Sequence, residues 1–592
     1  MNLSGLANII GNSIVGGVPV GGSVDTESMI FTITTTAPNE NFYLRSKSPS
    51  VNNYDVEWGD GNSEASVTDV NKLHVYAVAG TYEIKIKGDI YLNNDNTTTA
   101  AQYTEFKQWG TATTIRGIRE FFANCVNMTY TATDAPNFNF TVAGSYQGPY
   151  RLFFNCGAIT TLDLSNWNTS SFNGSTSGQT FYGMNNITSV NITGWDVSNI
   201  TQAVSWFYSS GNSGAGFTFT APNMDWSSCT SLSQFFFRCH MTSADVSNWT
   251  LNPSGISISQ MFRGIGETVV ATGGLNLDLS TWVNTGSVNT VSSLFLISRG
   301  LSSVNITNWD LSHITNFTTM FSSCYFLQEI VGLDTQRWDS ATTMDRAFYQ
   351  LYRIKFDTHN FHNDFGANWS VTNFNQCFYR CGMELTAASR GVIPNIVNWD
   401  MSSAVNVLNF FRDAEFADSN QTFAPSSSWD LSGLAGSDLA LFAYNSTGIE
   451  TFDWSNVTLT SAITSMSGFI RVVNNSASHP RTLTTIIFGA NCDFSGVTTW
   501  NNFAQAQSSL TTLTFDASVS FAGTTSMSSM LTNVPLNITS YDNLLIRAAA
   551  TNTNAVALTA SSSSFTCSPS AAATAEATLI AAGWTITDLP CT

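Results

Sequence analysis

The chain has 592 residues, of which only 11% are charged, and it carries a net charge of −19 at pH 7. Its 22 lysines and arginines are scattered without a run, which disfavours nucleic-acid binding because phosphate recognition requires clustered cations. An acidic chain is also repelled by anionic lipid, and no apolar stretch is long and unbroken enough to predict a membrane-spanning helix.

Residues 1–24 form an uncharged, apolar and glycine-rich segment. They lack the lysine or arginine that begins a secretory signal peptide, and Gly and Pro interrupt them. We expect this segment to anchor the chain on another protein. A disordered apolar tail is the alternative interpretation.

Residues 25–92 carry a recognisable set of motifs. Trp58-Gly-Asp60-Gly61 is followed by His74-Val-Tyr76 and then by Gly80-Thr-Tyr82, and the alternating apolar residues predict strands. The set resembles a PKD domain. The resemblance implies an immunoglobulin-like β-sandwich that serves as a spacer or presentation module, with residues 93–115 as a connector to the next part of the chain.

Residues 116–540 contain a repeat of about 28 residues, a period typical of solenoids. Tryptophan marks the repeat, and between Trp167 and Trp454 only Trp206 falls out of register. Units of this size cannot bury enough surface alone, so we expect stacked units with a continuous core. The repeating tryptophans are Trp167, Trp195, Trp226, Trp249, Trp282, Trp309, Trp338, Trp369, Trp399, Trp429 and Trp454.

Each unit predicts a strand, a corner and a turn. The alternation in Leu162-Asp-Leu, Val190-Asn-Ile and Val304-Asn-Ile is typical of half-buried strands. The Asp that follows many of the tryptophans is interpreted as the hydrogen-bonding residue of a corner. The Phe-rich stretch is expected to form a short helical turn, and the Trp and Phe side chains are expected to form internal ladders.

Five cysteines occupy one position, three residues after a Phe. We interpret them as small buried thiols rather than as zinc ligands or bridged pairs, since no second Cys or His pair stands at zinc spacing. Cys567 and Cys591 are the best disulfide candidates, and the sequence leaves open whether they are bridged. The five are Cys125, Cys156, Cys239, Cys324 and Cys381.

The combined pattern, Phe-x-x-Cys followed by Leu-x-Leu-Ser-x-Trp-Asp-x-Ser, resembles the BspA-like leucine-rich-repeat surface proteins of bacteria, mycoplasmas and some bacteriophages. The resemblance covers roughly residues 121–530. It weakens at Trp226, which lacks the Leu-x-Leu lead, and after Trp454. It implies an elongated leucine-rich-repeat-like solenoid with roles in adhesion and host contact.

Residues 541–592 are predicted to cap the last repeat. Ala571–Ala582 favour a helix that begins at Ser570 and ends at Gly583, and a strand over 583–588 follows. Contact with a partner is the alternative role for this end.

No catalytic or metal-binding constellation emerges from the sequence, so we expect no enzyme activity, cofactor or metal. His359 and His362 with nearby Asp364 are better explained as a solvated loop than as metal ligands. The segments 209–219 and 356–368 are candidate binding loops because they lengthen the distance between ladder residues.

These observations predict a mainly β, non-enzymatic protein. We expect a bacteriophage fibre, spike or decoration on the virion surface, attached to other virion proteins through residues 1–24 and contacting a host glycan or protein. The alternative is a secreted bacterial cell-surface adhesin. We expect no nucleic-acid partner and no membrane insertion, and the sequence leaves homo-oligomers open.

Overall fold

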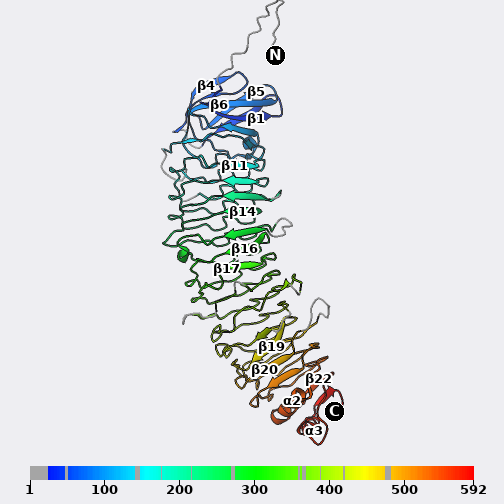
Figure 1. Ribbon diagram of the computed structural model, residues 1–592. Coiled ribbons are helices and arrows are strands. Elements are labelled where there is room, and N and C mark those ends of the chain that lie inside the picture. Colours follow the sequence, from blue (N-terminus) through cyan, green and yellow to red (C-terminus); the bar gives the residue numbers. More distant parts are fainter. Residues whose placement is uncertain are drawn as a thin grey trace, which may run out of the picture.

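The computed structural model is an elongated molecule, with a β-rich module at the N-terminal end, a long stack of rungs and two helices at the C-terminal end (Figure 1). It describes residues 24–46, 51–140, 147–174, 177–214, 216–267, 274–357, 360–362, 369–386, 389–417, 421–473 and 482–592. The anchoring segment, except for Val24, and His359 and Asp364 lie outside these ranges. The protein is mainly β, with few helices, and most of it is a solenoid of many turns.

The N-terminal module is built on one central sheet. Its path runs β10-β8-β6-β1-β7-β9, and β3 pairs with both β6 and β4. The strands are β1 (Met29–Thr35), β3 (Asn53–Glu57), β4 (Ser63–Val67), β6 (Gly80–Ile90), β7 (Tyr103–Gln108), β8 (Thr113–Ile115), β9 (Thr129–Tyr130) and β10 (Asn137–Phe138).

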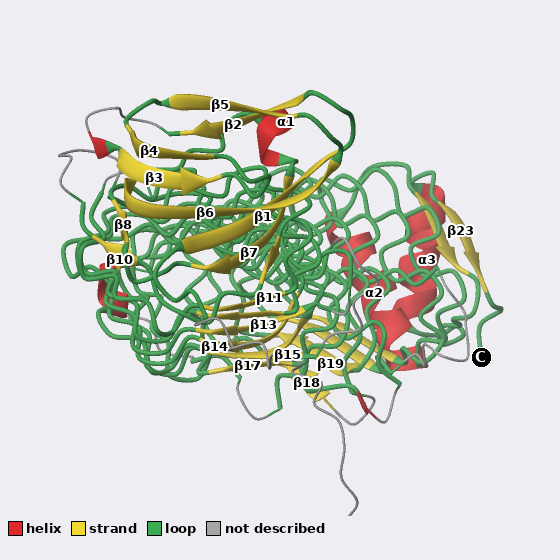
Figure 2. Cartoon of the chain, turned by 90° about the horizontal axis from the view of Figure 1, so that it is seen from above, coloured by secondary structure: helices red, strands yellow, loops and turns green. Residues whose placement is uncertain are grey.

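A two-stranded antiparallel sheet of β2 (Glu40–Arg45) and β5 (Asn71–Tyr76) lies on one face of the central sheet (Figure 2). Phe42 from β2 joins the two layers, because its ring contacts Tyr103 of β7 at 5.6 Å and Trp58 at 6.5 Å. These rings are fully buried. The module therefore has two β layers around an aromatic core.

Residues 93–115 are not the connector that the sequence led us to expect. They form the short helix α1 (Thr97–Ala100) and the strands β7 and β8. β7 pairs antiparallel with β1, and β8 pairs parallel with β6. The chain then continues through β9 and β10, which pair parallel with β7 and β8. The N-terminal sheet and the solenoid are thus joined by backbone hydrogen bonds, and no linker separates them.

The solenoid strands pair in parallel with their counterparts in the next rung (Figure 1). The first sheet holds β11 (Thr161–Asp163), β12 (Ser189–Asn191), β13 (Phe217–Thr220) and β14 (Met241–Asp245). The second holds β15 (Leu275–Asp278), β16 (Leu301–Asn305) and β17 (Glu329–Val331), and the short helix η2 (Thr285–Ser287) follows β15. The third holds β18 (Gln421–Phe423), β19 (Ile449–Trp454), β20 (Thr485–Phe488) and β21 (Thr512–Phe515). The alternating segments of the sequence are these strands.

The Phe-rich stretches form paired tight turns, and the expected helical turns are absent from them. Alternate amides bond to the next rung, such as Phe153 N–H to the Thr180 carbonyl at 2.7 Å. The amides between them bond three residues back, such as Cys156 N–H to the Phe153 carbonyl at 3.3 Å. An α-helix would need every amide for a bond four residues back, so the stacked rungs exclude it. Positive-φ residues recur four apart in most of these stretches, as at Gln179 and Gly183.

The Asp-x-Ser triplets form the corners of the rungs. In Asp310-Leu-Ser312 the Asp310 carboxylate accepts hydrogen bonds from the backbone N–H of Ser312 at 3.1 Å and from its hydroxyl at 2.6 Å. Equivalent bonds link Asp278 to Ser280. These carboxylates are occupied by local turn chemistry.

The C-terminal end contains two helices and a two-stranded parallel sheet. These are α2 (Ile538–Thr551), β22 (Ala557–Ala560), α3 (Ala571–Ala581) and β23 (Thr585–Asp588). The predicted boundary at 541 falls inside α2, whose first turn is capped by the Asn537 side chain. Cys567 and Cys591 form a disulfide, which settles a pairing that the sequence left open.

Candidate functional site: the ladders of the solenoid

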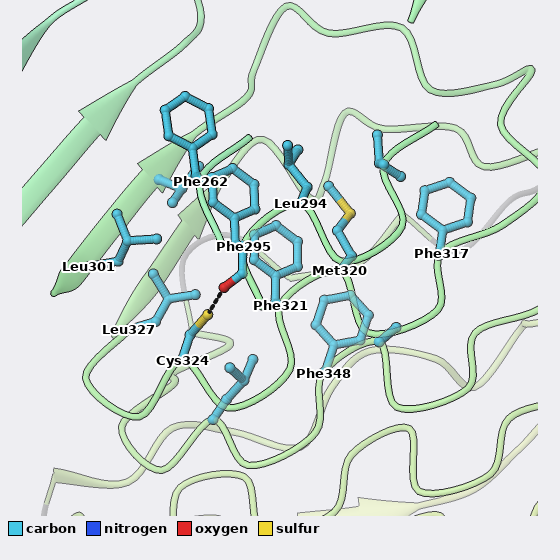
Figure 3. Packing of buried hydrophobic residues seen from close by; sticks show 14 of the residues in the cluster. Phe262, Leu294, Phe295, Leu301, Phe317, Met320, Phe321, Cys324, Leu327 and Phe348 are labelled. Atoms are coloured by element: carbon cyan, nitrogen blue, oxygen red, sulfur yellow. Dashed lines mark hydrogen bonds between the residues drawn. The ribbon is translucent and has the colours of Figure 1, made fainter. Parts of the chain in front are cut away.

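A phenylalanine ladder forms the spine of the core. Phe262, Phe295, Phe321 and Phe348 belong to successive rungs, and their rings stack at 5.4, 5.1 and 5.8 Å (Figure 3). The ladder runs from Phe122 to Phe411 and then shifts by one residue. The rung at the shift holds both Phe410 and Phe411, and it is the Phe410 ring that stacks on Phe442 in the next rung. Its rings are buried and belong to the scaffold.

Tryptophans form a second internal ladder beside the corners. Trp167 stacks on Trp195 at 5.8 Å, and Trp282 stacks on Trp249 at 5.2 Å and on Trp309 at 5.7 Å. The indole N–H groups donate to backbone carbonyls of the preceding rung at 2.7–3.0 Å in Trp195, Trp249, Trp282, Trp309 and Trp429. Trp399 is also fully buried, and its ring lies 5.6 Å from that of Trp369.

Trp338 does not occupy the ladder position that its spacing predicted. The Gln336 side chain takes that position and donates to the Ile306 carbonyl at 2.9 Å. Trp338 instead stacks on Phe317 at 4.9 Å. Ile330 of β17 pairs with Val304 of β16. More residues separate Ile330 from Trp338 than separate Val304 from Trp309, so the Trp338 ring lies beyond the corner. Trp454 also departs, because it is the last residue of β19.

The five repeated cysteines lie at one position of the rung, directly after the second positive-φ residue. The thiols of Cys156, Cys324 and Cys381 donate to the carbonyls of Phe122, Phe295 and Phe348 in the preceding rung. Among the five, Cys125 and Cys156 are on neighbouring rungs, whereas Cys239, Cys324 and Cys381 are separated by one or two rungs with other residues at this position. Ser210 and Ser298 fill the same position and make the same bond, a relation that we missed in the sequence.

The thiols are sealed from solvent. All eight free cysteines are buried. Burial raises the pKa of Cys324 to about 12 and that of Cys229 to about 11, because the thiolate would lose its hydration. They are protonated packing groups at neutral pH and poor nucleophiles.

The motif residues of the N-terminal module gather around one buried ring, Trp58. The His74 ring stacks on Trp58 at 4.6 Å, and its Nε2 lies 2.8 Å from the Asp60 carboxylate. The Tyr76 hydroxyl donates to the Trp58 carbonyl at 2.8 Å, and Tyr82 stacks on Tyr76 at 4.0 Å.

Two glycines shape the ends of this group. Gly61 has φ of +92°, which suits the turn that follows Asp60. Gly80 begins β6, and its N–H donates to the Thr35 hydroxyl at 3.1 Å. The contacts of all seven motif residues are those of a fold core and its turn.

A third ladder, on the outside, was not anticipated from the sequence. It occupies the position directly before the second positive-φ residue of each paired turn, and we call it the outer row. Its signal in the sequence is the aromatic or Arg residue that follows the core Phe, as in Phe181-Tyr182 and Phe262-Arg263. The outer row reads Ala123, Phe154, Tyr182, Tyr208, Phe237, Arg263, Leu296, Ser322, Tyr349, Tyr379, Arg412, Tyr444, Gln505 and Thr532, and Arg471 belongs to it because its carbonyl accepts from the Asn445 N–H as that of Tyr444 accepts from the Asp413 N–H.

Rings of the outer row stack from rung to rung and end on arginines. Phe154, Tyr182, Tyr208 and Phe237 stack at 4.9, 4.8 and 4.7 Å. The Arg263 guanidinium lies 5.2 Å from the centre of the Phe237 ring. Since each ring covers its neighbour, this stack turns ring edges rather than ring faces to solvent.

The second half of the outer row inserts arginine between tyrosines. Tyr349 stacks on Tyr379 at 4.9 Å, and Arg412 lies 5.8 Å from the Tyr379 ring and 5.0 Å from the Tyr444 ring. Burial raises the pKa of Tyr349 and of Tyr379, so these hydroxyls remain donors at neutral pH.

Two parallel rows flank the outer row. On one side, the side chains of Gln234 and Gln260 are hydrogen-bonded at 3.1 Å, and Arg151 donates to Gln179 at 2.7 Å. On the other side, Arg299 lies 4.8 Å from the Tyr325 ring, and Tyr325 stacks on Tyr352 at 4.5 Å. The three rows together form an edge of arginine, amide and phenol groups.

An exposed threonine row lies elsewhere on the rungs, but its hydroxyls are occupied. Thr342 donates to the Thr315 carbonyl at 3.0 Å, and Thr372 donates to the Thr342 carbonyl at 3.2 Å. The same bond recurs between Thr525 and Thr498 at 3.1 Å. This row links rungs and is a weaker candidate for ligand recognition than the outer row.

The two segments predicted as binding loops, 209–219 and 356–368, add few candidate recognition groups. Of segment 209–219, residues 217–219 belong to β13 and position 215 is outside the described ranges, as are positions 358–359 and 363–368 within 356–368. A cavity of about 510 Å³ is lined by Tyr130, Thr161 and Asp163 among others, but the Asp163 carboxylate accepts from Ser165 in a corner turn.

Within the described ranges, no three His, Cys, Asp or Glu side chains are grouped as a metal site would require. No helix among the described residues has the length and apolar character needed to cross a membrane.

Comparison with known proteins supports the repeat assignment. Residues 148–272 and 257–385 match the family described as "Mycoplasma protein of unknown function, DUF285". The chain fits a BspA-like repeat protein. The matched ranges cover rungs in which the Phe, Trp and outer ladders are all present, so the family match and the three ladders fall on the same part of the chain.

Two further comparisons add no functional argument. A solved structure described as "Crystal structure of TLR13-ssRNA13 complex" is similar over 78% of this chain and 67% of that one, at 11% identity and a TM-score of 0.13. That score is too low to support a shared fold or ligand. No curated protein matches the chain.

Proposed function

We propose that this protein is a non-enzymatic surface adhesion protein whose recognition surface is the side of the solenoid. The observation that carries the proposal is the outer row, which presents stacked phenols and arginines along successive rungs. Extended repeat surfaces of this kind suit weak, multivalent contacts, because each rung adds one more contact of the same type.

The architecture supports projection of that surface. Backbone pairing between β7 and β9 and between β8 and β10 joins the N-terminal module to the rungs without a linker. We propose that the module is a PKD-like, immunoglobulin-like spacer and that α2, α3 and β23 cap the last rung. A rigid rod holds its side rows in one line, which lowers the entropy lost when several contacts form at once.

The residue types that serve in catalysis have structural roles here, which supports a non-enzymatic protein. Asp residues at the corners accept turn hydrogen bonds, as Asp310 does from Ser312. The cysteines are buried donors to carbonyls, as Cys324 is to Phe295. The arginine and phenol groups of the outer row are recognition groups.

Adhesion is tested with the full-length chain, labelled with a fluorophore and incubated with intact cells of candidate bacterial hosts. We expect the folded chain to be retained saturably on some cells, and we expect no retention of the heat-unfolded chain at the same concentration. Equal retention of the folded and unfolded chains, or no retention on any cell type, would contradict an adhesive function.

We propose that the protein is part of a bacteriophage particle, attached to other virion proteins through residues 1–24, with the bacterial cell surface as the alternative. Quantitative peptide mass spectrometry on density-purified particles and on cell envelopes from one culture separates the two. Enrichment in particles supports the virion. Enrichment in envelopes supports the bacterial adhesin and leaves the adhesive function intact.

A further inference from the structure

The arginines of the solenoid are concentrated on the paired turns that carry the outer row. Arg238, Arg263, Arg299, Arg380 and Arg412 belong to five of these turns, in a chain whose net charge is −19. Arg238, at 46% side-chain exposure, is more open than Arg412, at 32%. Most arginines of the solenoid therefore lie along this row of turns, with carboxylates such as Glu267, Glu384 and Asp413 among them. We call these arginines, together with Arg151, Arg346, Arg353 and Arg471, the arginine strip.

Aromatic rings hold several of these arginines in place. Arg151 lies 4.7 Å from the centre of the Phe154 ring, Arg299 lies 4.8 Å from that of Tyr325, and Arg412 lies 5.0 Å from that of Tyr444. A guanidinium that rests on a ring keeps its N–H edge free for an acceptor. Such an immobilised fork loses little conformational freedom when it binds a carboxylate or a sulfate.

Part of the strip has no internal counterion. No carboxylate among the described residues lies within 4.0 Å of the guanidinium nitrogens of Arg263, Arg299 or Arg471. Others are paired, such as Arg238 with Glu267 at 3.0 Å and Arg353 with Glu384 at 3.3 Å. These pairs are partly exposed, and such pairs exchange readily for an external anion because they contribute little stability.

The groups beside the strip indicate what kind of anion fits. The Gln234 and Gln260 amides and the phenols of Tyr182 and Tyr208 add neutral hydrogen-bonding groups on several rungs. A polynucleotide would need free ring faces for base stacking, and those faces are covered by neighbouring rings at 4.7–4.9 Å. A sugar chain needs hydroxyl partners and, where acidic, a cation at regular intervals.

We propose that the arginine strip and its flanking amide row bind a linear acidic polysaccharide that lies along the solenoid axis. The ring stacking of 4.7–4.9 Å sets the repeat of the surface, close to the length of one sugar unit. Each carboxylate or sulfate faces a guanidinium, and the sugar hydroxyls face amide and phenol groups. This inference rests on the proposed adhesive function and names its ligand class.

Binding of the full-length protein to polygalacturonate and to dextran sulfate tests the proposal, with neutral dextran as the reference. The test variant is R263Q/R299Q/R412Q. The matched control is R116Q/R337Q/R547Q, which removes the same charge from side chains off the paired turns. We expect the strip variant to lose about tenfold in affinity for at least one polyanion, and the control to lose less than about threefold. The affinity of the unaltered protein should fall with salt.

Three outcomes would overturn the proposal: no binding to either polyanion, equal losses in both variants, or binding of single-stranded polynucleotide or poly-glutamate at least as tight as that of the polysaccharides. Circular dichroism of both variants establishes that they are folded. A protein that adheres to cells but ignores the polyanions retains its proposed function and loses only this ligand assignment. A protein that binds the polyanions without adhering to cells retains the ligand assignment and loses the proposed adhesive function.

Discussion

The Trp ladder allows one hydrogen bond to be isolated from the packing around it. Trp309 is 5% exposed, and its indole N–H donates to the Leu279 carbonyl of the preceding rung at 2.9 Å. Trp338 is 1% exposed and stacks in the same core, but its indole N–H has no acceptor among the described residues. Replacing each with Phe removes the same atoms from a buried ring, and only Trp309→Phe also breaks a bond between rungs.

The size of the difference depends on the acceptor. The Leu279 carbonyl also accepts from the Trp282 N–H at 3.2 Å, so losing the indole leaves it with one bond rather than none. The expected extra cost is that of an ordinary neutral hydrogen bond, about 0.5–1.5 kcal/mol, and not the larger penalty of an orphaned buried group. That free energy corresponds to local opening about two- to tenfold more frequent.

Amide hydrogen exchange read by mass spectrometry on peptides from the altered rung is the suitable assay, because a long repeat array does not unfold in one cooperative step. Exchange in the Trp309→Phe rung should accelerate by that factor relative to the Trp338→Phe rung, each measured against the unaltered chain. Equal acceleration, or a larger effect at Trp338, would refute the reasoning that indole hydrogen bonds stabilise the stack.

Three further outcomes test the core and the module. The eight free cysteines should not react with a disulfide reagent at pH 8 until the chain is unfolded, since burial raises the pKa of Cys324 to about 12; fast labelling of the native chain would contradict this. Asp25 has its pKa lowered from 3.8 to about 2: burial raises it, and hydrogen bonds from Ser28 and Glu27 with the charge of Lys85 outweigh that effect. Its ionised form therefore stabilises the module by about 1–2 kcal/mol above pH 4, and this stabilisation is lost as the pH falls from 4 to 2. D25N should flatten that part of the plot of urea midpoint against pH. E415Q should destabilise its rung by about 3–5 kcal/mol, because Glu415 and Arg390 form an ion pair with side chains only 2% and 3% exposed. Local hydrogen exchange measures this loss of stability, and a loss below about 1 kcal/mol would contradict a buried ion pair.

Much of the scaffold could be predicted because the strand and the corner of each rung are specified by residues within that rung. The alternation at Val190-Asn-Ile and Val304-Asn-Ile became β12 and β16, and the Asp-x-Ser triplets became corners. These features depend on residues a few positions apart, and repetition multiplies the signal. The solenoid and its repeat family were within reach for that reason.

Register from rung to rung was beyond the sequence. Trp338 and Gln336 exchange roles because the corner between Ile330 and Trp338 has extra residues, and a spacing near the mean period hides that shift. The lateral shift of the Phe ladder at Phe410 and Phe411 has another origin: the backbone register is kept, Ala443 takes the position of Phe411, and the stacking aromatic stands one residue earlier, at Phe442. Which side chain enters a ladder is decided by pairing with the neighbouring rung.

The sequence by itself determined the period, the strands, the corners and the burial of the Trp, Phe and Cys side chains, since periodic apolar residues reveal local structure directly. The tertiary structure alone decided three things: the union of the N-terminal sheet with the first rungs through β7 to β10, the absence of helix in the Phe-rich turns, and the outer row. The first two depend on where backbone amides find acceptors, and the outer row depends on which side chains the stacked rungs bring together. In a stack of rungs those acceptors lie on the next turn of the chain, some tens of residues away, where no local pattern can point to them.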